Sequence, residues 1–189
     1  MKRIYIIAGC NGAGKTTASY TVLPEILKCD EFVNADEIAR GLSPFKPESV
    51  AIQAGRLMLN RIDELLKKEV SFAIETTLAT KSYQNLIVKA KEKGYQTTIV
   101  FFWLNSVQLA KERVRFRIKE GGHAIPEEVI ERRYYSGLKN FFTIYMNIVT
   151  NWQFYDNSKI KQEIIAYADN GEMNILEDIK WRKINEQYK

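Results

Sequence analysis

The sequence predicts an α/β fold in which a mostly parallel β-sheet carries helices on both faces. Short apolar runs rich in β-branched residues alternate with longer stretches of helical periodicity, which is typical of strands joined by crossover helices. A glycine-rich turn lies between the first of these runs and the helix that follows it. No internal repeat, low-complexity tract or linker interrupts the alternation, so we expect a single domain over residues 1–189.

The first half of the chain supplies three strands and four helices. The strands are expected at 3–8, 31–34 and 71–75. The helices are expected over 15–23, which Pro24 ends; over 37–40, which Gly41 ends; over 47–69, which Pro47 opens; and from a cap at Thr80 to Gly94.

The second half begins with the clearest strand of the chain, 96–104, whose sequence is QTTIVFFWL. Ser106 is expected to cap a helix that runs to about residue 120, where the segment GGHAIP interrupts the helical pattern. Pro126 opens another long helix that continues to about residue 149. The remaining expected elements are strands at 152–155 and 163–168 and a terminal helix from Ile175 onward.

The composition is ordinary for a soluble globular protein, with 46% hydrophobic and 27% charged residues. A net charge of +5 suits either a nucleic-acid surface or a site for polyanionic small molecules. Cys10, Cys29 and the single histidine, His123, cannot complete a four-ligand zinc site or a disulfide framework, which indicates a reducing cytoplasm. The apolar run near the first residue is too short for a signal peptide, and no run suggests a membrane span.

Gly9, Gly14, Lys15 and Thr16 match the phosphate-loop pattern G-x-x-x-x-G-K-[ST] between a strand and a helix. In such a loop, backbone N–H groups surround phosphate oxygens, the lysine spans the β- and γ-phosphates and the threonine hydroxyl holds Mg²⁺. The pattern predicts that ATP and Mg²⁺ bind here, and its alternative is a glycine-rich turn with a solvated lysine. The residues expected to bind the nucleotide are Gly12, Ala13, Gly14, Lys15, Thr16 and Thr17.

The phosphate loop alone does not fix the class of protein, because GTPases, transporter ATPases and small-molecule kinases share it. The chain contains no N-K-x-D stretch for guanine, no L-S-G-G-Q transporter signature and no second module of a helicase. Its size and spacing favour a small kinase. Such an enzyme must supply a base, magnesium and cations for the transferred charge.

Two carboxylates follow predicted strands at the sheet edge where ligands of open α/β sheets bind. Asp36, in FVNAD, is a candidate base for an acceptor hydroxyl and equally a candidate N-cap for the helix at 37–40. Glu75, in SFAIETT, is a candidate to bind acceptor hydroxyls or to position magnesium-bound water. The alternative for Glu75 is a strand-end carboxylate exposed to water.

The segment KERVRFRIKEGGHAIPEEVIERRYY carries five arginines around a glycine-containing break. Arg113 and Arg117 are four residues apart and share a helix face, whereas Arg115 points elsewhere. We interpret this region, about 106–135, as a lid that brings guanidinium groups over the phosphates. Its alternative is a solvated basic face paired with glutamates. The aromatic residues of YYSGLKNFFTIYMNIV have helical spacing, which favours core packing over base stacking.

Four stretches in this order resemble the zeta-toxin-like P-loop kinases over roughly residues 3–157. They are GCNGAGKTT, FVNADEIARGLSPFKPES, FAIETTLAT and ERVRFRIKEGGHAIPEEVIERRYYSGLKNF, of which the second and fourth are specific. The resemblance implies a P-loop NTPase three-layer α/β sandwich of the nucleotide-kinase kind with a helical lid. It also implies transfer of phosphate from ATP, with Mg²⁺, to the 3′-hydroxyl of the amino sugar in UDP-N-acetylglucosamine.

Carried over by motif position, the resemblance implies roles for individual residues. Lys15 and Thr16 would serve ATP and Mg²⁺, Asp36 would be the base, Glu75 and Thr77 would lie near the acceptor, and Arg113 or Arg117 would be a lid arginine. The chain departs from the pattern at His123, which stands where the long zeta toxins place a second lid arginine, so Arg132 or Arg133 is expected to take that role. An antitoxin is the protein partner that the family implies.

The leading hypothesis is therefore a cytoplasmic ATP-dependent kinase that acts on a hydroxyl of a small molecule, with a nucleotide-activated sugar as acceptor. A nucleoside monophosphate or an antibiotic hydroxyl is the alternative acceptor. The rival from another class is a nucleotide-gated protein that binds RNA with its basic lid. The net charge of +5 favours this rival, whereas the helical spacing of the aromatics and the lack of an RNA-binding motif argue against it.

Overall fold

The computed structural model describes residues 1–119, 121–122 and 124–188, and its centre is a seven-stranded sheet in the order β2-β3-β1-β4-β5-β6-β7. Neighbouring strands from β2 to β5 are parallel, while β6 pairs antiparallel with β5 and β7 with β6. The expected mostly parallel sheet is confirmed. The strands are β1 (Arg3–Ala8), β2 (Phe32–Val33), β3 (Phe72–Thr76), β4 (Gln96–Trp103), β5 (Asn151–Asp156), β6 (Glu163–Asp169) and β7 (Glu172–Ile175).

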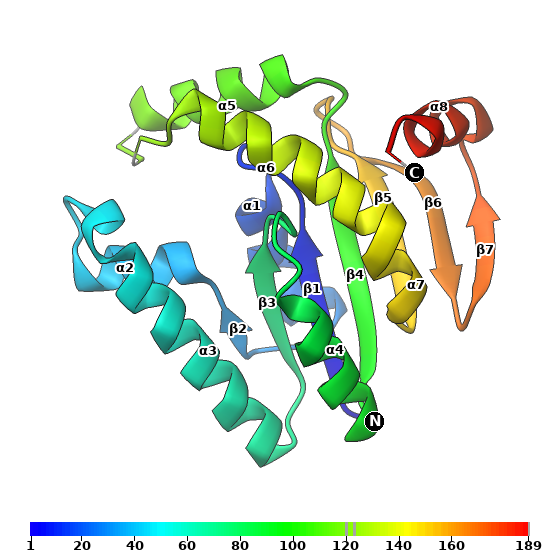
Figure 1. Cartoon of the computed structure of the whole chain (residues 1–189), viewed down its shortest axis with the longest axis horizontal. Helices are drawn as coiled ribbons and strands as arrows, with labels where there is room; N and C mark the ends of the chain where they lie inside the picture. The colour runs from blue at the N-terminus through cyan, green and yellow to red at the C-terminus, as the bar shows by residue number, and fades with distance from the viewer. Residues whose placement is uncertain (120, 123, 189) are drawn as a thin grey trace.

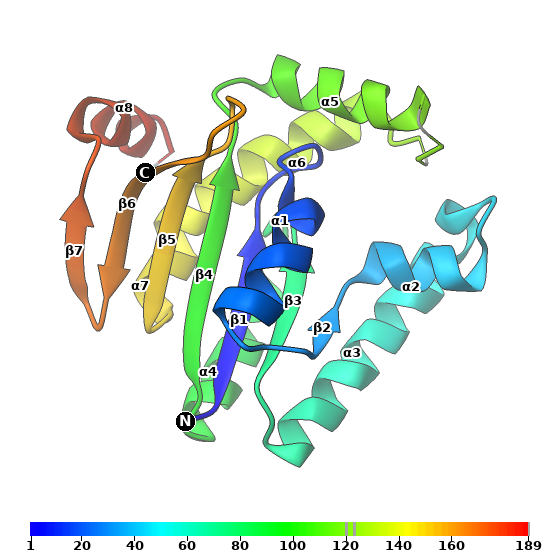
Figure 2. The ribbon, with the colours of Figure 1, turned by 180° about the vertical axis from the view of Figure 1, so that it is seen from behind.

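Helices lie on both faces of this sheet, as expected. Figure 1 shows α4, α6 and α7 in front of the strands, and the reverse view in Figure 2 shows α1 on the other face. Within the described ranges, no helix combines the length and apolarity needed to cross a membrane. The helices are α1 (Lys15–Thr21), η1 (Val22–Ile26), α2 (Ala35–Leu42), η2 (Pro47–Val50), α3 (Ala51–Lys68), α4 (Tyr83–Glu92), α5 (Val107–Lys119), α6 (Glu127–Asn140), η3 (Phe141–Tyr145), α7 (Met146–Ile148) and α8 (Asp178–Tyr188).

Aromatic side chains form the part of the core that lies between the sheet and the helical stretch α6–η3–α7. The rings of Phe101 and Phe154 stack at 5.1 Å, and Phe141 packs against both. Trp181 of α8 stacks on Trp152 of β5 at 5.3 Å. Buried rings of this size dominate the free energy of a core, so the aromatic run is confirmed as core except at Tyr135, which is 42% exposed.

The carboxyl ends of the parallel strands meet at one edge of the sheet. Ala8, the last residue of β1, pairs with Thr76 of β3 on one side and with Phe101 of β4 on the other. The loops after β1 and β3 therefore start side by side. This is the edge at which open α/β sheets bind ligands.

The end of the chain differs from the prediction of a helix from Ile175 onward. Glu172–Ile175 forms β7, which pairs with β6, and α8 begins only at Asp178. The turn between the two strands has positive φ at Asn170 (49°) and Gly171 (89°). An Asn-Gly pair with both φ values positive is the strongest short hairpin signal, and it outweighs the helical pattern that follows.

Several helix boundaries also differ, and α2 continues past Gly41 to Leu42. Helix α1 passes into the π-helical turn η1, which contains Pro24, so the proline does not end the helix; its fixed φ is compatible with a helical backbone. Helix α2 begins at Ala35 with Asn34 as its N-cap, so the interpretation of Asp36 as a cap is wrong. The Thr80 hydroxyl bonds Ser82 Oγ at 2.8 Å and α4 begins at Tyr83, so Thr80 caps no helix.

Candidate active site

The phosphate loop adopts a conformation that its glycines permit. Gly9, Gly12 and Gly14 have φ values of 140°, 81° and 81°. A Cβ on Gly12 would lie 2.8 Å from the carbonyl oxygen of Ala110, and one on Gly14 would lie 2.6 Å from Asn157 Nδ2. Only glycine fits these positions, which leaves the backbone N–H groups accessible to phosphate oxygens.

A buried polar network joins the phosphate loop to β3. Thr16 Oγ1 donates to Glu75 Oε2 at 2.8 Å, and Asn34 Nδ2 donates to the same oxygen at 3.0 Å. Lys15 Nζ lies 3.6 Å from Glu75 Oε1 and donates to the carbonyl oxygen of Cys10 at 3.0 Å. The side chains of Lys15 and Glu75 are only 7% and 9% exposed, so Glu75 is not the solvated strand-end carboxylate of the alternative interpretation.

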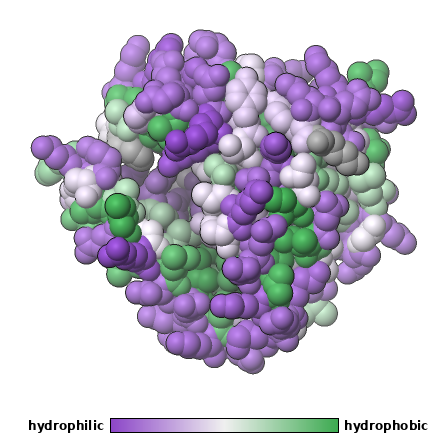
Figure 3. Space-filling model, viewed as in Figure 1, coloured by the Kyte–Doolittle hydropathy of each residue, from purple (hydrophilic) through white to green (hydrophobic). Residues whose placement is uncertain are grey.

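Two cavities open beside this network and share part of their walls. The first, of about 560 Å³, contains the phosphate loop and α5, and we call it the donor cavity. The second, of about 440 Å³, lies between β3, α4 and α6, and we call it the acceptor cavity. Figure 3 shows the molecule hollowed on the face seen in Figure 1, with hydrophilic atoms along the upper rim. The residues that line both cavities are Asn11, Lys15, Asp36 and Glu75.

The position of Asp36 follows from the cap of α2. Asn34 Oδ1 accepts the backbone N–H groups of Asp36 at 2.8 Å and Glu37 at 3.4 Å, which fixes the start of the helix. The Asp36 side chain takes no part in this cap and lies on the shared wall of the two cavities. Burial lowers the pKa of Arg133 and the negative charge of Asp36 opposes this, as expected for two charged groups that face one cavity.

The acceptor cavity combines hydroxyl groups with positive charge. Arg132 and Arg133 of α6 line it, and Arg133 Nη1 donates to Asn11 Oδ1 of the phosphate loop at 3.1 Å. Burial raises the pKa of the Tyr83 hydroxyl, which therefore keeps its proton. The cavity's hydroxyl-bearing residues are Thr76, Thr77, Thr80, Tyr83 and Ser136.

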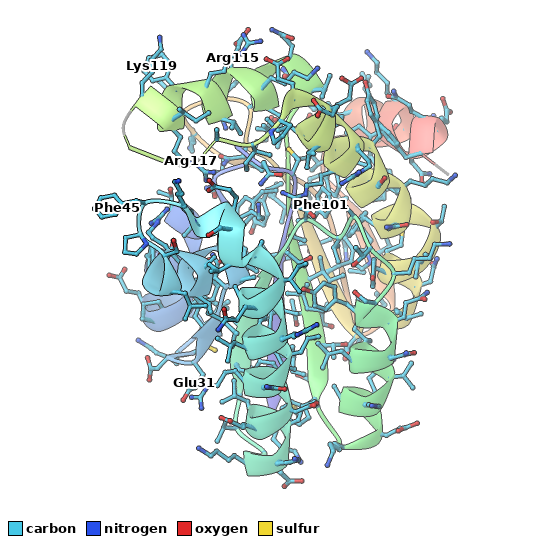
Figure 4. All side chains as sticks on the ribbon, turned by 60° about the vertical axis from the view of Figure 1, so that its left-hand side comes forward. Glu31, Phe45, Phe101, Arg115, Arg117 and Lys119 are labelled. Atoms are coloured by element: carbon cyan, nitrogen blue, oxygen red, sulfur yellow. The ribbon has the colours of Figure 1, made fainter. Side chains whose placement is uncertain are left out.

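The arginines of α5 lie on two faces of the helix, with Arg113 and Arg117 in the donor cavity and Arg115 on the outer face. Figure 4 shows Arg117 projecting from α5 toward α2, whereas Arg115 and Lys119 project away. Arg117 Nε and Nη2 are buried and have no hydrogen-bond partner among the described residues. Arg113 Nη1 and Nη2 donate to the carbonyl oxygens of Asn157 and Ser158 at 2.9 and 3.0 Å.

The remaining expected site residues fall in different places. Thr17 and Thr77 line the donor and the acceptor cavity, respectively, whereas Ala13, within the phosphate loop, is fully buried. Burial raises the pKa of the Cys10 thiol to about 11, which keeps it protonated, and the residue is only 6% exposed. His123 lies outside the described residues.

Sequence reasoning missed several residues of the site. Asn11 lies in the phosphate loop and Asn34 in FVNAD, where an asparagine two residues before Asp36 is a signal for a helix N-cap. Tyr83 and Ser136 reach the acceptor cavity only because α4 and α6 pack over β3. No spacing in the chain indicates their role.

A family model described as zeta toxin matches residues 1–178. The chain belongs to the zeta toxin family. A protein of Haemophilus influenzae (strain Rd), described only as uncharacterized, is 29% identical over 126 residues, which are 67% of this chain and 88% of that protein. That bacterial relative is shorter than this zeta toxin family member, because the same 126 residues make up a larger share of it.

Solved structures show the same fold. AvrRxo1-ORF1, in a crystal structure with -ORF2 and ATP, superposes with a TM-score of 0.77 at 16% identity over 98% of this chain. This chain spans 64% of that one. A structure from the PezAT toxin-antitoxin system of Streptococcus pneumoniae gives a TM-score of 0.66 at 16% identity, over 98% of this chain and 86% of that one. Family membership together with this phosphate-loop fold supports ATP-dependent kinase activity.

Proposed function

We propose that this protein transfers the γ-phosphate of ATP to a hydroxyl of a nucleotide-activated sugar, with UDP-N-acetylglucosamine as the expected acceptor. The observation that carries the proposal is the shared wall of the donor and acceptor cavities, where Lys15, Asp36 and Glu75 stand together. A phosphate donor on one side and an alcohol on the other would meet across Asp36. This is the arrangement that in-line phosphoryl transfer requires.

In the proposed reaction Asp36 accepts the proton of the acceptor hydroxyl. The hydroxyl oxygen forms a bond to the terminal phosphorus, and the bond from that phosphorus to the β,γ-bridging oxygen breaks to release ADP. Lys15 and the backbone of the phosphate loop would hold the phosphates. Arg117, whose guanidinium has buried nitrogens without a described partner, would balance the charge that develops on the transferred group.

The residues of the buried polar network between the phosphate loop and β3 fit Mg²⁺. This cation prefers oxygen ligands, and the protein usually supplies only one or two of them. The Thr16 hydroxyl and the Glu75 carboxylate, 2.8 Å apart, are such ligands, the second directly or through water. A bound Mg²⁺ would neutralise phosphate charge. The hydrogen bond between Thr16 and Glu75 would open when Thr16 turns toward the ion.

The choice of a sugar nucleotide rests on the chemistry of the acceptor cavity. Arg132 and Arg133 suit a diphosphate, since one guanidinium group can donate two parallel hydrogen bonds to the oxygens of a phosphate. The hydroxyl groups of Thr77, Thr80 and Ser136 suit a sugar ring. The zeta-toxin resemblance of the motifs points to the same class.

An antitoxin partner belongs to the same proposal. Two of the similar structures come from AvrRxo1-ORF1 with -ORF2 and from a toxin-antitoxin system. Large apolar side chains are exposed, among them Phe116, which lines the donor cavity, at 67% and Phe45, in the loop after α2, at 97%. Exposed apolar residues of this size suit a protein partner.

The test is a transfer assay with ATP, Mg²⁺ and either UDP-N-acetylglucosamine or a nucleoside monophosphate, read by mass spectrometry of the acceptor. We expect phosphorylation of the sugar nucleotide. Asp36→Asn should lower the rate by about 10²- to 10⁴-fold while ATP affinity stays within about twofold, because the base acts only on the acceptor. Asp63→Asn, at an exposed carboxylate of α3, is the control and should retain full activity.

Three results would contradict the proposal. Transfer to the monophosphate and not to the sugar nucleotide would show that the proposed acceptor is wrong. If Asp36→Asn kept its activity, the assignment of Asp36 as the base would be wrong. RNA binding that weakens steeply with salt, without transfer to any small molecule, would favour the rival class.

A further inference from the structure

The loop after β3, residues 77–82, forms one wall of the acceptor cavity through Thr77, Ala79 and Thr80. Its backbone takes an unusual path, since Leu78 is fully buried and has a φ of 54°, a value that residues with a Cβ rarely adopt. Locally, the Thr76 hydroxyl accepts the N–H of Leu78 at 3.0 Å, and the hydroxyls of Thr80 and Ser82 share a hydrogen bond at 2.8 Å. Such local bonds are weak restraints, so other elements must hold this conformation.

The helical stretch α6–η3 touches this loop at three carbonyl groups. Gly137 packs so closely that a Cβ there would lie 2.4 Å from the Thr77 oxygen. Asn140 Nδ2 donates to the Leu78 oxygen at 2.7 Å, and Tyr145 Oη donates to the Thr80 oxygen at 2.7 Å. Burial raises the pKa of Tyr145 to about 12, so the hydroxyl keeps its proton and remains a donor.

The π-helical turn η3 explains why Asn140 and Tyr145 reach the same loop. In an α-helix, residues five apart point about 140° away from each other. A π-helix closes each turn with an i→i+5 hydrogen bond, which brings such residues nearly above one another. The turn at Phe141–Tyr145 therefore aligns both donors, and π-turns in helices are frequent at functional sites.

We propose that Asn140 and Tyr145 are positioning residues for the acceptor, which they serve by holding the loop at 77–80. This inference rests on the proposed function, because the loop matters for catalysis only if the acceptor binds beside it. Neither side chain lines the acceptor cavity, so both act through the loop backbone. Their loss would weaken acceptor binding and leave the phosphate loop in place.

The chain offers a matched control for each residue. Tyr134 lies on the same helix, is 5% exposed, and its hydroxyl donates at 2.7 Å to the carbonyl of Leu104, away from the loop at 77–80. Asn157 is 9% exposed against 7% for Asn140, and its Nδ2 donates at 2.7 Å to the Ala13 carbonyl in the phosphate loop. Tyr134→Phe and Asn157→Ala thus each remove a buried hydrogen bond of the same kind as those of Tyr145 and Asn140, but one that does not reach the loop at 77–80.

Amide hydrogen exchange of the full chain without substrates tests the inference independently of the acceptor. We expect Asn140→Ala to speed exchange at residues 76–80 about tenfold and Tyr145→Phe about fivefold, with no change at residues 9–16. Asn157→Ala should do the reverse, and Tyr134→Phe should alter neither segment. Faster exchange in both segments with every variant, or no change at 76–80 in Tyr145→Phe, would overturn the inference.

Kinetics with ATP and UDP-N-acetylglucosamine give the second readout. Tyr145→Phe should raise KM for the sugar nucleotide about fivefold while KM for ATP and kcat stay within about twofold. Tyr134→Phe should leave all three constants unchanged. If the wild-type chain does not phosphorylate this sugar nucleotide, the proposed acceptor fails and the exchange pattern decides the inference. If the wild type is active and Tyr145→Phe raises KM for ATP instead, the positioning role is wrong.

Discussion

The loops after β1 and β3 begin side by side and face the same cleft, but they hold their shapes in different ways. The phosphate loop places glycines at its three positions of positive φ. The loop after β3 has no glycine and keeps Leu78 at a φ of 54°, which costs on the order of 1–3 kcal/mol. Contacts from α6 and η3 offset that cost.

The difference shows where the information for each loop resides. The conformation of the phosphate loop is encoded in its own residues, so eight letters suffice to recognise it. The conformation of the second loop is imposed by a helix more than fifty residues further along the chain. Substitutions in the two loops and in their neighbours should therefore behave differently.

The largest effect is expected from Gly14→Ala in the phosphate loop. Gly14 and Gly94 have nearly the same φ, 81° and 78°, but a Cβ on Gly94 would meet nothing within 4 Å. Both alanine variants should lose about 1–2 kcal/mol of unfolding free energy from backbone strain, measured by urea denaturation. Only Gly14→Ala should also lose ATP affinity, by about 100-fold or more in calorimetry. The added methyl group would displace Asn157 and the backbone N–H groups of the phosphate loop that are expected to bind phosphate. Equal ATP affinities in the two variants would remove this distinction.

An intermediate effect is expected from Gly137→Ala, which would press a methyl group against the Thr77 carbonyl. This oxygen belongs to the backbone and cannot swing aside, so we expect a loss of about 1–3 kcal/mol in unfolding free energy. Gly55→Ala is the matched control in α3, where a Cβ has open space. It should gain about 0.5–1 kcal/mol from helix propensity. Equal melting temperatures for both variants would mean that α6 does not support the loop.

The smallest effect is expected from Thr76→Ala, which removes the hydroxyl that accepts a hydrogen bond from the Leu78 N–H. The loss should be about 1 kcal/mol in urea denaturation, and Thr76→Ser should recover most of it. A larger loss in Thr76→Ala than in Gly137→Ala would show that the second loop, like the first, is shaped by its own residues.

The fold was largely predictable because its signals are local. Buried parallel strands appear as apolar runs, and helices between them show their own periodicity. The hairpin of β6 and β7 is not part of the prediction although Asn170-Gly171 is a hairpin signal, because the helical periodicity that follows covers more residues than this two-residue signal. The π-turn η3 leaves no mark in the sequence that periodicity can detect.

The candidate site divides in the same manner. Lys15, Thr16, Asp36 and Glu75 follow strand ends or a known pattern, so their place on the cleft was foreseeable. The buried asparagines at 140 and 157 were not, because each acts on a carbonyl far away in the chain. Asn157 and its partner Ala13 are separated by 144 positions. Only the folded chain brings such pairs together.

The external support of the loop after β3 bears on how kinases of this architecture diversify. A helix that shapes the acceptor wall from behind can accumulate substitutions that remodel the wall while the phosphate loop keeps its glycines. New alcohol specificities would then arise by mutation at a distance from the bound alcohol. Comparing such enzymes by the residues that touch their substrates would overlook the changes that made them diverge.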